Sequence, residues 1–171
     1  MNILETERLL FRKHILADKD AYCAMEMDAD IRRFVGGYPR TREDAEKRFA
    51  GTIKPSDDSL RMWATILKDE KKYIGRCGIY PHFDGPGNPI DGEASLGLYI
   101  ATPYCGNGFA TEAGKGFIDI GFNKLRLKRI VTMVQAGNNA SVRVLEKLGF
   151  HLASTEEGAR TFYHFVLENA G

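Results

Sequence analysis

The chain has 171 residues, 43% of them hydrophobic and 27% charged, which predicts one globular domain with a substantial core. Its formal net charge of +1 excludes the broad basic surface with which proteins bind nucleic acid or anionic membranes. No apolar run approaches roughly 18 residues and the first residues lack a signal-peptide pattern, so we expect a cytoplasmic protein without a membrane partner.

The first half of the chain alternates short strands and helices. Apolar patterning predicts strands at 9–13, 62–67 and 73–80 and a helix at 18–27. The glycines and proline of FVGGYPRT end that helix, and Thr41 is a good cap for a second helix at 41–50. The stretch at 81–92 is rich in glycine, proline and aspartate, so we expect a long irregular loop there.

The second half joins longer elements. The pattern predicts strands at 93–100, 130–134, 150–154 and 160–167, with helices at 109–124 and 141–148. The first of these helices would bury Phe109, Ala113, Phe117 and Ile120 on one face. Two strand–helix–strand units after a meander imply a mixed sheet with helices on both faces, within a single α/β or α+β domain spanning residues 1–171.

Cysteines and histidines give no sign of a metal site. The three cysteines share no CxxC spacing, and the four histidines form no HxxxH pair. Zinc ligands usually recur at such spacings. We therefore predict neither a metal nor a disulfide framework.

The stretch PYCGNGFATEAGKGF, residues 103–117, places Gly106 and Gly108 between a predicted strand and a predicted helix. A Walker loop would need Ser or Thr after Gly-Lys, but glycine follows here, and a dinucleotide fingerprint would need a third glycine where Thr111 stands. What remains is Gly-x-Gly-x-Ala at a helix start, where the main-chain N–H groups of 107–110 can converge on a diphosphate. A plain tight turn is the structural alternative.

A second pattern, QAGNNASVRVLEKLGF, covers residues 135–150. Asn138 or Asn139 is a natural cap for the helix that follows, and Gly149 supplies its left-handed end. Capping explains both residue types, but it does not explain why this unit directly follows the glycine turn.

Together these patterns resemble the GCN5-related N-acetyltransferase (GNAT) family, and specifically its branch similar to the RimJ/RimL-type ribosomal-protein N-terminal acetyltransferases. The resemblance lies in ETERLLFRK, FVGGYPRTREDAEKRF, SLGLYIATPYCGNGFATEA and NNASVRVLEKLGF, and so runs along nearly the whole chain. It implies a single-domain GNAT fold, with a mixed, mostly antiparallel central sheet of about seven strands and helices on both faces. It also implies acetyl-CoA as co-substrate.

The resemblance further implies which residues bind the coenzyme. The family's loop R/Q-G-x-G-x-G/A reads here from Cys105 to Ala110, so that Cys105 departs from arginine or glutamine. Asn138 matches the family's signature asparagine beside the pantetheine arm, and Leu145 replaces its usual tyrosine acid. The expected coenzyme contacts are Leu98, Tyr99, Ile100, Cys105, Gly106, Asn107, Gly108, Phe109, Ala110, Thr111, Asn138, Ser141, Arg143 and Lys147.

The implied reaction is direct attack of an amine on the thioester. Glu93 is the candidate base, with Ser95 two residues on and on the same side of the strand, where it could hold a relaying water. The alternative for Glu93 is a solvated charge at a strand end. Ser141 is the implied partner of the leaving thiol, and an N–H of the 98–99 segment would face the oxyanion.

The acceptor is expected to be a small-molecule amine or a peptide N-terminus, entering between FVGGYPR and the 82–92 loop. Candidate walls are Phe34, Tyr38 and Phe83, whereas Trp63 fits the core better. The basic run at 124–129 could contact the 3′-phosphate of CoA or be a solvated rim. A homodimer is common in the family. A CoA-binding module without catalysis and a nucleotide-dependent enzyme are the alternative functions.

Overall fold

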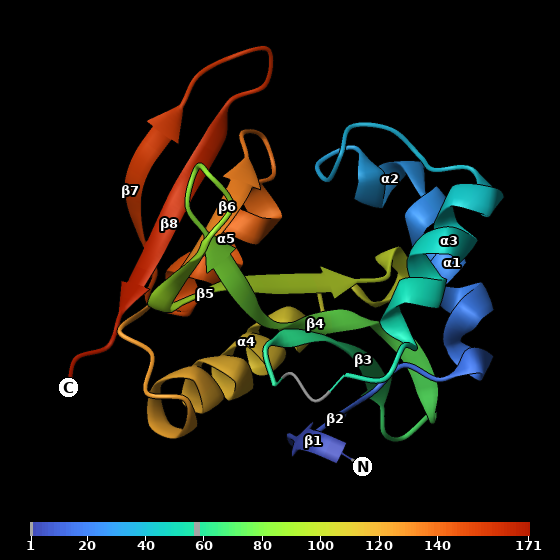
Figure 1. Cartoon of the computed structure of the whole chain (residues 1–171). Coiled ribbons are helices and arrows are strands. Elements are labelled where there is room, and N and C mark those ends of the chain that lie inside the picture. Colours follow the sequence, from blue (N-terminus) through green and yellow to red (C-terminus); the bar gives the residue numbers. More distant parts are fainter. Residues whose placement is uncertain (1, 57–58) are drawn as a thin grey trace.

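The computed structural model describes residues 2–56 and 59–171 (Figure 1). Their strands form one eight-stranded sheet in the order β1-β2-β3-β4-β5-β6-β8-β7. The strands are β1 (Asn2–Glu5), β2 (Leu9–Arg12), β3 (Arg61–Leu67), β4 (Lys72–Phe83), β5 (Pro89–Ile100), β6 (Arg129–Gln135), β7 (His151–Glu156) and β8 (Phe162–Glu168). The α-helices are α1 (Lys19–Met27), α2 (Ala29–Arg32), α3 (Arg42–Thr52), α4 (Phe109–Asp119) and α5 (Asn139–Lys147).

The sheet is mixed and mostly antiparallel, as predicted. Each strand pairs antiparallel with its neighbour except β5 and β6, which are parallel and joined through α4. The eighth strand is β1, a four-residue edge strand on β2 that the sequence pattern did not predict. A short edge strand such as β1 buries few side chains, so its sequence need not alternate between apolar and polar residues.

Helices cover both faces of the sheet (Figure 1). On one face α4 buries Phe109, Ala113 and Phe117, and the ring of Phe117 meets Phe11 of β2 edge-to-face with centroids 4.9 Å apart. Full burial of each such side chain contributes roughly 1.5–3 kcal/mol to folding. Because Gly114 has no side chain, the C-terminal end of α5 can pack closely against α4, and Leu148 occupies the space that a Cβ at Gly114 would take. This face therefore forms the main core.

On the other face α1 and α3 pack through a smaller cluster formed by Tyr22, Cys23, Ala45 and Phe49. The hydroxyl of Thr41 accepts a hydrogen bond from the N–H of Asp44 (3.2 Å), so the predicted cap of α3 is confirmed. The short helix α2, capped by Asp28, was not predicted. At four residues it is too short to show a helical period.

The expected long loop at 81–92 is wrong. Strand β4 continues to Phe83 and β5 begins at Pro89, leaving a turn at 84–88. In that turn Asp84 Oδ1 accepts from the N–H of Asn88 (2.8 Å). Glu93 therefore lies in the interior of β5, and its side chain is 10% exposed rather than solvated at a strand end.

Candidate active site

The strands β5 and β6 separate in the middle of the sheet. Their pairing runs from Glu93 opposite Arg129 to Ser95 opposite Val131, while β5 continues to Ile100 and β6 to Gln135. Figure 1 shows the arrowheads of β5 and β6 pointing in diverging directions. An opening between the two strands therefore begins at Ser95.

Main-chain groups of β5 face this opening. On the β4 side, the N–H of Ala101 donates to Ile74 O (2.8 Å). On the β6 side, the hydroxyl of Thr132 donates to Leu96 O (3.1 Å). Because antiparallel strands direct their main-chain groups alternately to either side, those of Leu98 and Ile100 point the same way as Leu96, into the opening. Those of Tyr99 point toward β4. Of the 98–99 segment, Leu98 thus fits an oxyanion contact better than Tyr99.

The glycine turn lies at the end of β5 and starts α4. Gly106 and Gly108 have φ of 78° and 80°, a left-handed conformation that favours glycine. Within the described ranges, no protein acceptor takes a hydrogen bond from the main-chain N–H groups of 107–110. The first helical bond there runs from Glu112 N to Gly108 O (3.0 Å). These donors and the positive end of the α4 dipole can therefore hold an anion.

Side chains of the turn mostly point away from those donors. The thiol of Cys105 lies 3.5 Å from Ile100 O, and burial followed by the charge of Asp28 raises its pKa. Asn107 folds its amide back onto Tyr104 O (3.1 Å), and Phe109 is buried in the core. The first helical turn, with Ala110 and Thr111, is half-buried. The turn thus presents main chain, not side chains, to a ligand.

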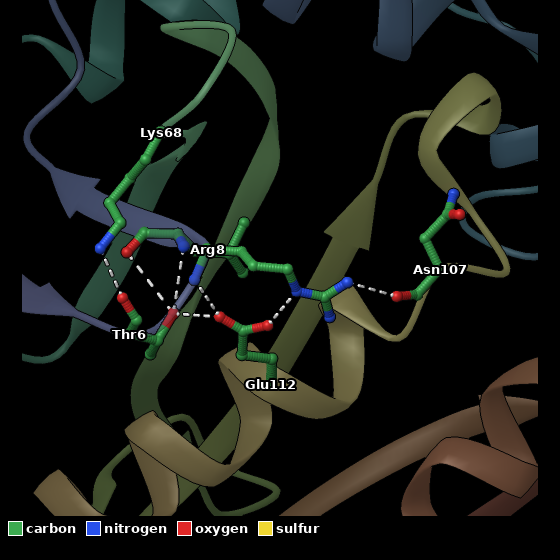
Figure 2. Close-up of polar contacts among 6 residues, drawn as sticks. Thr6, Arg8, Lys68, Asn107 and Glu112 are labelled. Carbon is green, nitrogen blue, oxygen red and sulfur yellow. Dashed lines mark hydrogen bonds and ion pairs between the residues drawn. The ribbon is translucent and has the colours of Figure 1, made fainter.

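Arg8 adds a positive charge to the turn (Figure 2). Its guanidinium donates to Asn107 O (2.9 Å) and to Glu112 Oε2 (2.7 Å), and it lies 4.4 Å from the centroid of the Phe109 ring. Glu112 also accepts from Thr6 (2.6 Å) and from Arg8 N (2.8 Å). Burial opposes ionisation of Glu112, but these donors outweigh it and lower its pKa. The start of β2 and the glycine turn are thereby held together.

Asn138 is the cap of α5, which supports the structural explanation for it. Its Oδ1 accepts from the N–H of Ser141 (3.3 Å), and both residues are half-buried. Leu145 is 4% exposed, in the core beneath α5. A side chain at that position points into packed protein, so Leu145 itself offers no contact to a thiol.

Ionisable side chains gather on the sheet face opposite α4, where the opening begins. Glu93 Oε1 accepts from Arg129 Nε (2.6 Å), and Oε2 lies 3.9 Å from His82 Nε2. The other ring nitrogen of His82, Nδ1, is 3.3 Å from Ser95 Oγ. Glu93 Oε2 is buried and has no hydrogen-bond partner in the part of the chain that the structure describes. The imidazole therefore lies between the two side chains that the sequence predicts to handle the proton, hydrogen-bonded to Ser95 and close to Glu93.

His82, Arg129 and Arg8 were not singled out by sequence reasoning. His82 was counted as an isolated histidine, and Arg129 as the end of a basic run. The cross-strand pairing of Ser95 with Tyr80, two residues before His82, would have been the signal, but it requires the register of the β4–β5 hairpin. Correct hairpin boundaries would have brought Glu93, Ser95 and His82 to one face.

The expected acceptor walls lie around the same face. Phe34 lies beside the β6–α5 turn, 3.7 Å from the position that a Cβ would take at Gly137. Arg160 of the β7–β8 turn donates to Gly36 O (3.3 Å), which ties down the 34–38 segment. Tyr38 and Phe83 are 66% and 51% exposed, whereas Trp63 is buried in the core as expected.

The basic residues expected near CoA are dispersed. Arg143 and Lys147 are exposed on α5, one helical turn apart. The 124–129 run begins about 15 residues after the glycine turn, on the order of 20 Å along the α4 axis, so it does not suit the 3′-phosphate of a CoA bound at that turn. Arg129 instead pairs with Glu93.

Comparison with known proteins identifies the family. The model of the acetyltransferase (GNAT) domain matches residues 8–151. The chain is 31% identical over 155 residues to the uncharacterized N-acetyltransferase p20 of Bacillus licheniformis, covering 88% of this chain and 83% of that protein. The chain belongs to the GNAT family, and it is an acetyltransferase.

Solved structures agree in fold. The GNAT-family acetyltransferase from Bacillus anthracis superposes with a TM-score of 0.84 at 22% identity, with all of both chains covered. The spermidine N-acetyltransferase from Vibrio cholerae, solved with CoA and spermine, reaches 0.76 at 18% identity, over 96% of this chain and 98% of that one.

The described residues contain neither a membrane-spanning helix nor a cluster of metal-ligating side chains. None of the helices in residues 2–56 and 59–171 is long and apolar enough to cross a membrane. Over the same residues, no group of three or more His, Cys, Asp or Glu side chains is arranged to hold a metal ion.

Proposed function

We propose that this enzyme transfers the acetyl group of acetyl-CoA to a primary amine, either a small molecule or a peptide N-terminus, through one acetyltransferase domain spanning residues 1–171. The observation that carries the proposal is the adjacency of two features: the free donors at 107–110 and the open edge of β5 that leads away from them. A diphosphate on the first places an extended thioester arm along the second, with Leu98 N–H toward the carbonyl oxygen. Asn138, Ser141, Arg143 and Lys147 complete the coenzyme contacts.

The resemblance of the sequence to RimJ/RimL-type enzymes supports our proposal that the enzyme belongs to that branch of the family. The segments ETERLLFRK and NNASVRVLEKLGF carry that assignment. Arg8, inside the first segment, contacts the glycine turn directly, which gives the segment a physical role in this fold. An α-amine with a pKa of about 8 is roughly one-tenth neutral at pH 7, whereas a lysine amine at about 10.4 is neutral only about once in a few thousand. An N-terminus is therefore the easier protein acceptor.

The amine must lose a proton as it attacks, and His82 is placed to accept it. Its Nδ1 lies 3.3 Å from Ser95 Oγ, at the start of the opening. Behind it, Glu93 Oε2 is 3.9 Å from Nε2 and can stabilise the imidazolium that forms. Arg129 holds the other carboxylate oxygen and so orients Glu93. Ser95 positions the amine or a relaying water.

The departing thiolate needs little assistance. A thiol pKa of about 8.5 makes the thiolate a good leaving group near neutral pH. Ser141, at the start of α5, or a water can supply the proton. The leucine at 145 is then compatible with turnover.

The test is acetyl-CoA turnover on a panel of amines, followed as release of free thiol. Replacing the base lowers kcat by about 10² to 10⁴, so His82→Gln should lose at least a hundredfold and Glu93→Gln less. The limb of the pH–rate profile that reports the base should disappear in His82→Gln and persist in Glu93→Gln. His151→Gln, an exposed histidine on β7, is the matched control. If Glu93→Gln removes the limb and His82→Gln keeps it, Glu93 is itself the base.

A CoA-binding module without catalysis is the second candidate. It is favoured by the ion pair that occupies one oxygen of Glu93 and by the buried leucine at 145. Tight CoA binding by calorimetry, with no thiol release on any amine, would support this second function and refute the first.

A further inference from the structure

An excess of positive charge surrounds one buried carboxylate of α1. Glu26 is 2% exposed, and four arginines approach it: Arg40 at 2.7 Å, Arg32 and Arg48 at 3.7 Å, and Arg76 in a direct hydrogen bond. Burial opposes ionisation of Glu26, but the arginines, Arg76 foremost, outweigh it and lower its pKa. One carboxylate cannot neutralise four guanidinium groups, so this cluster keeps a net positive charge.

Two of the guanidinium groups in this region carry buried nitrogens that no described residue satisfies. Arg76 Nη1 and Arg61 Nη1 are buried and have no hydrogen-bond partner in residues 2–56 and 59–171. Arg76 lies between the rings of Tyr22 and Tyr99, 4.6 and 5.0 Å from their centroids. Because a buried charged donor without a partner is costly, an acceptor from outside the protein would be stabilised here, and Arg61 lines the cavity through which it could approach.

A cavity of about 420 Å³ adjoins the cluster. Its described lining comprises Tyr22, Lys47, Arg48, Gly51, Thr52, Arg61 and Met62. All charged side chains in that lining are basic. Arg48 belongs to both the cavity and the Glu26 cluster, and Tyr22 lines the cavity while contacting Arg76, so the two are continuous.

The cavity lies on the same face of the sheet as the proton-transfer residues. The side chain of Met62 covers Gly97, where an added Cβ would lie 2.7 Å from Met62 Cε and 3.3 Å from the Tyr80 ring. Gly97 follows Ser95 by two residues on β5, and Met62 is on β3, two strands away. Two interstrand spacings place the cavity about 10 Å from the β5 edge.

We propose that the acceptor is an amine that also carries an anionic group, a carboxylate or a phosphate, about 10 Å from the reacting nitrogen, and that this group binds Arg48 and Arg61 in the cavity. Guanidinium groups pair with both anions in the same two-pronged geometry. The inference rests on the proposed function, since it names the acceptor of that reaction.

The same charges select against polyamines. A polycation in this cavity would meet Lys47, Arg48 and Arg61 without a free carboxylate in the described lining. Positive surroundings also favour the neutral form of an amine, which is the form that attacks the thioester. This acceptor site therefore differs in charge from one suited to spermine, even though the fold is shared with a spermidine N-acetyltransferase.

The test uses acceptors matched in length. An extended chain advances about 3.3–3.6 Å per residue, so three residues span the distance. The panel is trialanine with a free carboxylate, its C-terminal amide, the amide with phosphoserine as third residue, and spermidine. Binding to the CoA-saturated protein is measured by calorimetry and acetyl transfer by thiol release, in the unmodified chain, Arg48→Gln, Arg61→Gln and, as a control of equal charge change on the outer face of α4, Lys115→Gln.

We expect the acid or the phosphopeptide to bind at least tenfold more tightly than the amide, the size of one charge-assisted hydrogen bond. Arg48→Gln and Arg61→Gln should abolish this preference, and Lys115→Gln should keep it. Preference for one anion over the other identifies the group. Equal binding of acid, phosphopeptide and amide, or tighter binding of spermidine, overturns the inference. If binding shows the preference but no amine is ever acetylated, the proposed function fails and the anion site stands.

Discussion

Removing Arg8 should weaken CoA binding through the diphosphate. Arg8, directly before β2, is the one charged side chain in Figure 2 that reaches the carbonyl of Asn107 in the glycine turn. In Arg8→Ala the turn loses this hydrogen bond, the Glu112 ion pair at 2.7 Å and the guanidinium over Phe109. The free donors at 107–110 remain, but the positive charge beside them and the tether to β2 are lost.

The size of the effect follows from exposure. The Arg8 side chain is 40% exposed, so its ion pair with Glu112 contributes at most about 1 kcal/mol to stability. For binding, the loss of one charge-assisted contact is worth about 1.5 kcal/mol, or about tenfold in Kd. Arg8→Lys keeps the charge but not the fork that reaches Asn107 and Glu112 together, so we expect a smaller loss of about threefold.

Calorimetry with three ligands separates the possible causes. CoA and dephospho-CoA both contain the diphosphate, whereas pantetheine contains no phosphate. The tenfold loss in Arg8→Ala should appear with the first two ligands and be absent with the third. An unchanged Kd for CoA, or an equal loss for pantetheine, would refute a role of Arg8 at the diphosphate.

Three further predictions concern the turn, the core and a helix cap. Gly106→Ala should raise the Kd for CoA at least tenfold, because φ at this residue is 78° and the new methyl would enter open space beside the donors. The control is Gly87→Ala in the distant 84–88 turn, where φ is 94° and the space is equally open; this variant should bind CoA normally. Burial lowers the pKa of His14 from 6.5 to about 4. As the pH falls, the histidine therefore takes up a proton in the unfolded chain before it does so in the folded protein. The free energy of unfolding should accordingly fall by up to about 3 kcal/mol between pH 6.5 and 4. Urea titrations of His14→Phe should lack that fall. Thr41→Ala should cost about 1 kcal/mol by the same assay, and Thr41→Asn should cost little.

The glycine turn could be predicted because its cause is local. Left-handed φ at Gly106 and Gly108 and a helix beginning at Phe109 depend on neighbouring residues alone. The same holds for the cap at Asn138, where the side chain bonds a group three residues away. Such features appear in the sequence as short, fixed spacings, and the family resemblance rests on them.

The environment of Glu93 could not be predicted, because it depends on pairing between strands. His82 reaches it across the β4–β5 hairpin, whose boundaries the sequence pattern does not reveal, because Pro, Gly and Asp at 81–92 predict a loop throughout. In the structure only those at 84–87 lie in the tight turn, whereas Pro81 lies within β4 and Pro89, Asp91 and Gly92 lie within β5. Arg129 reaches Glu93 through the parallel pairing of β5 with β6, 36 residues away in the chain.

Arg8 also bears on the departure of Cys105 from the family's arginine or glutamine. The thiol at this position turns back to the end of β5, and it cannot replace an arginine, because a thiol is neutral when protonated and negative when ionised. The guanidinium that the turn lacks in its own segment is supplied instead by Arg8, nearly a hundred positions earlier in the chain. A substitution that looks like a loss within the motif is thus offset by a contact outside it, and Arg8→Ala tests this in a chain whose turn has no arginine of its own.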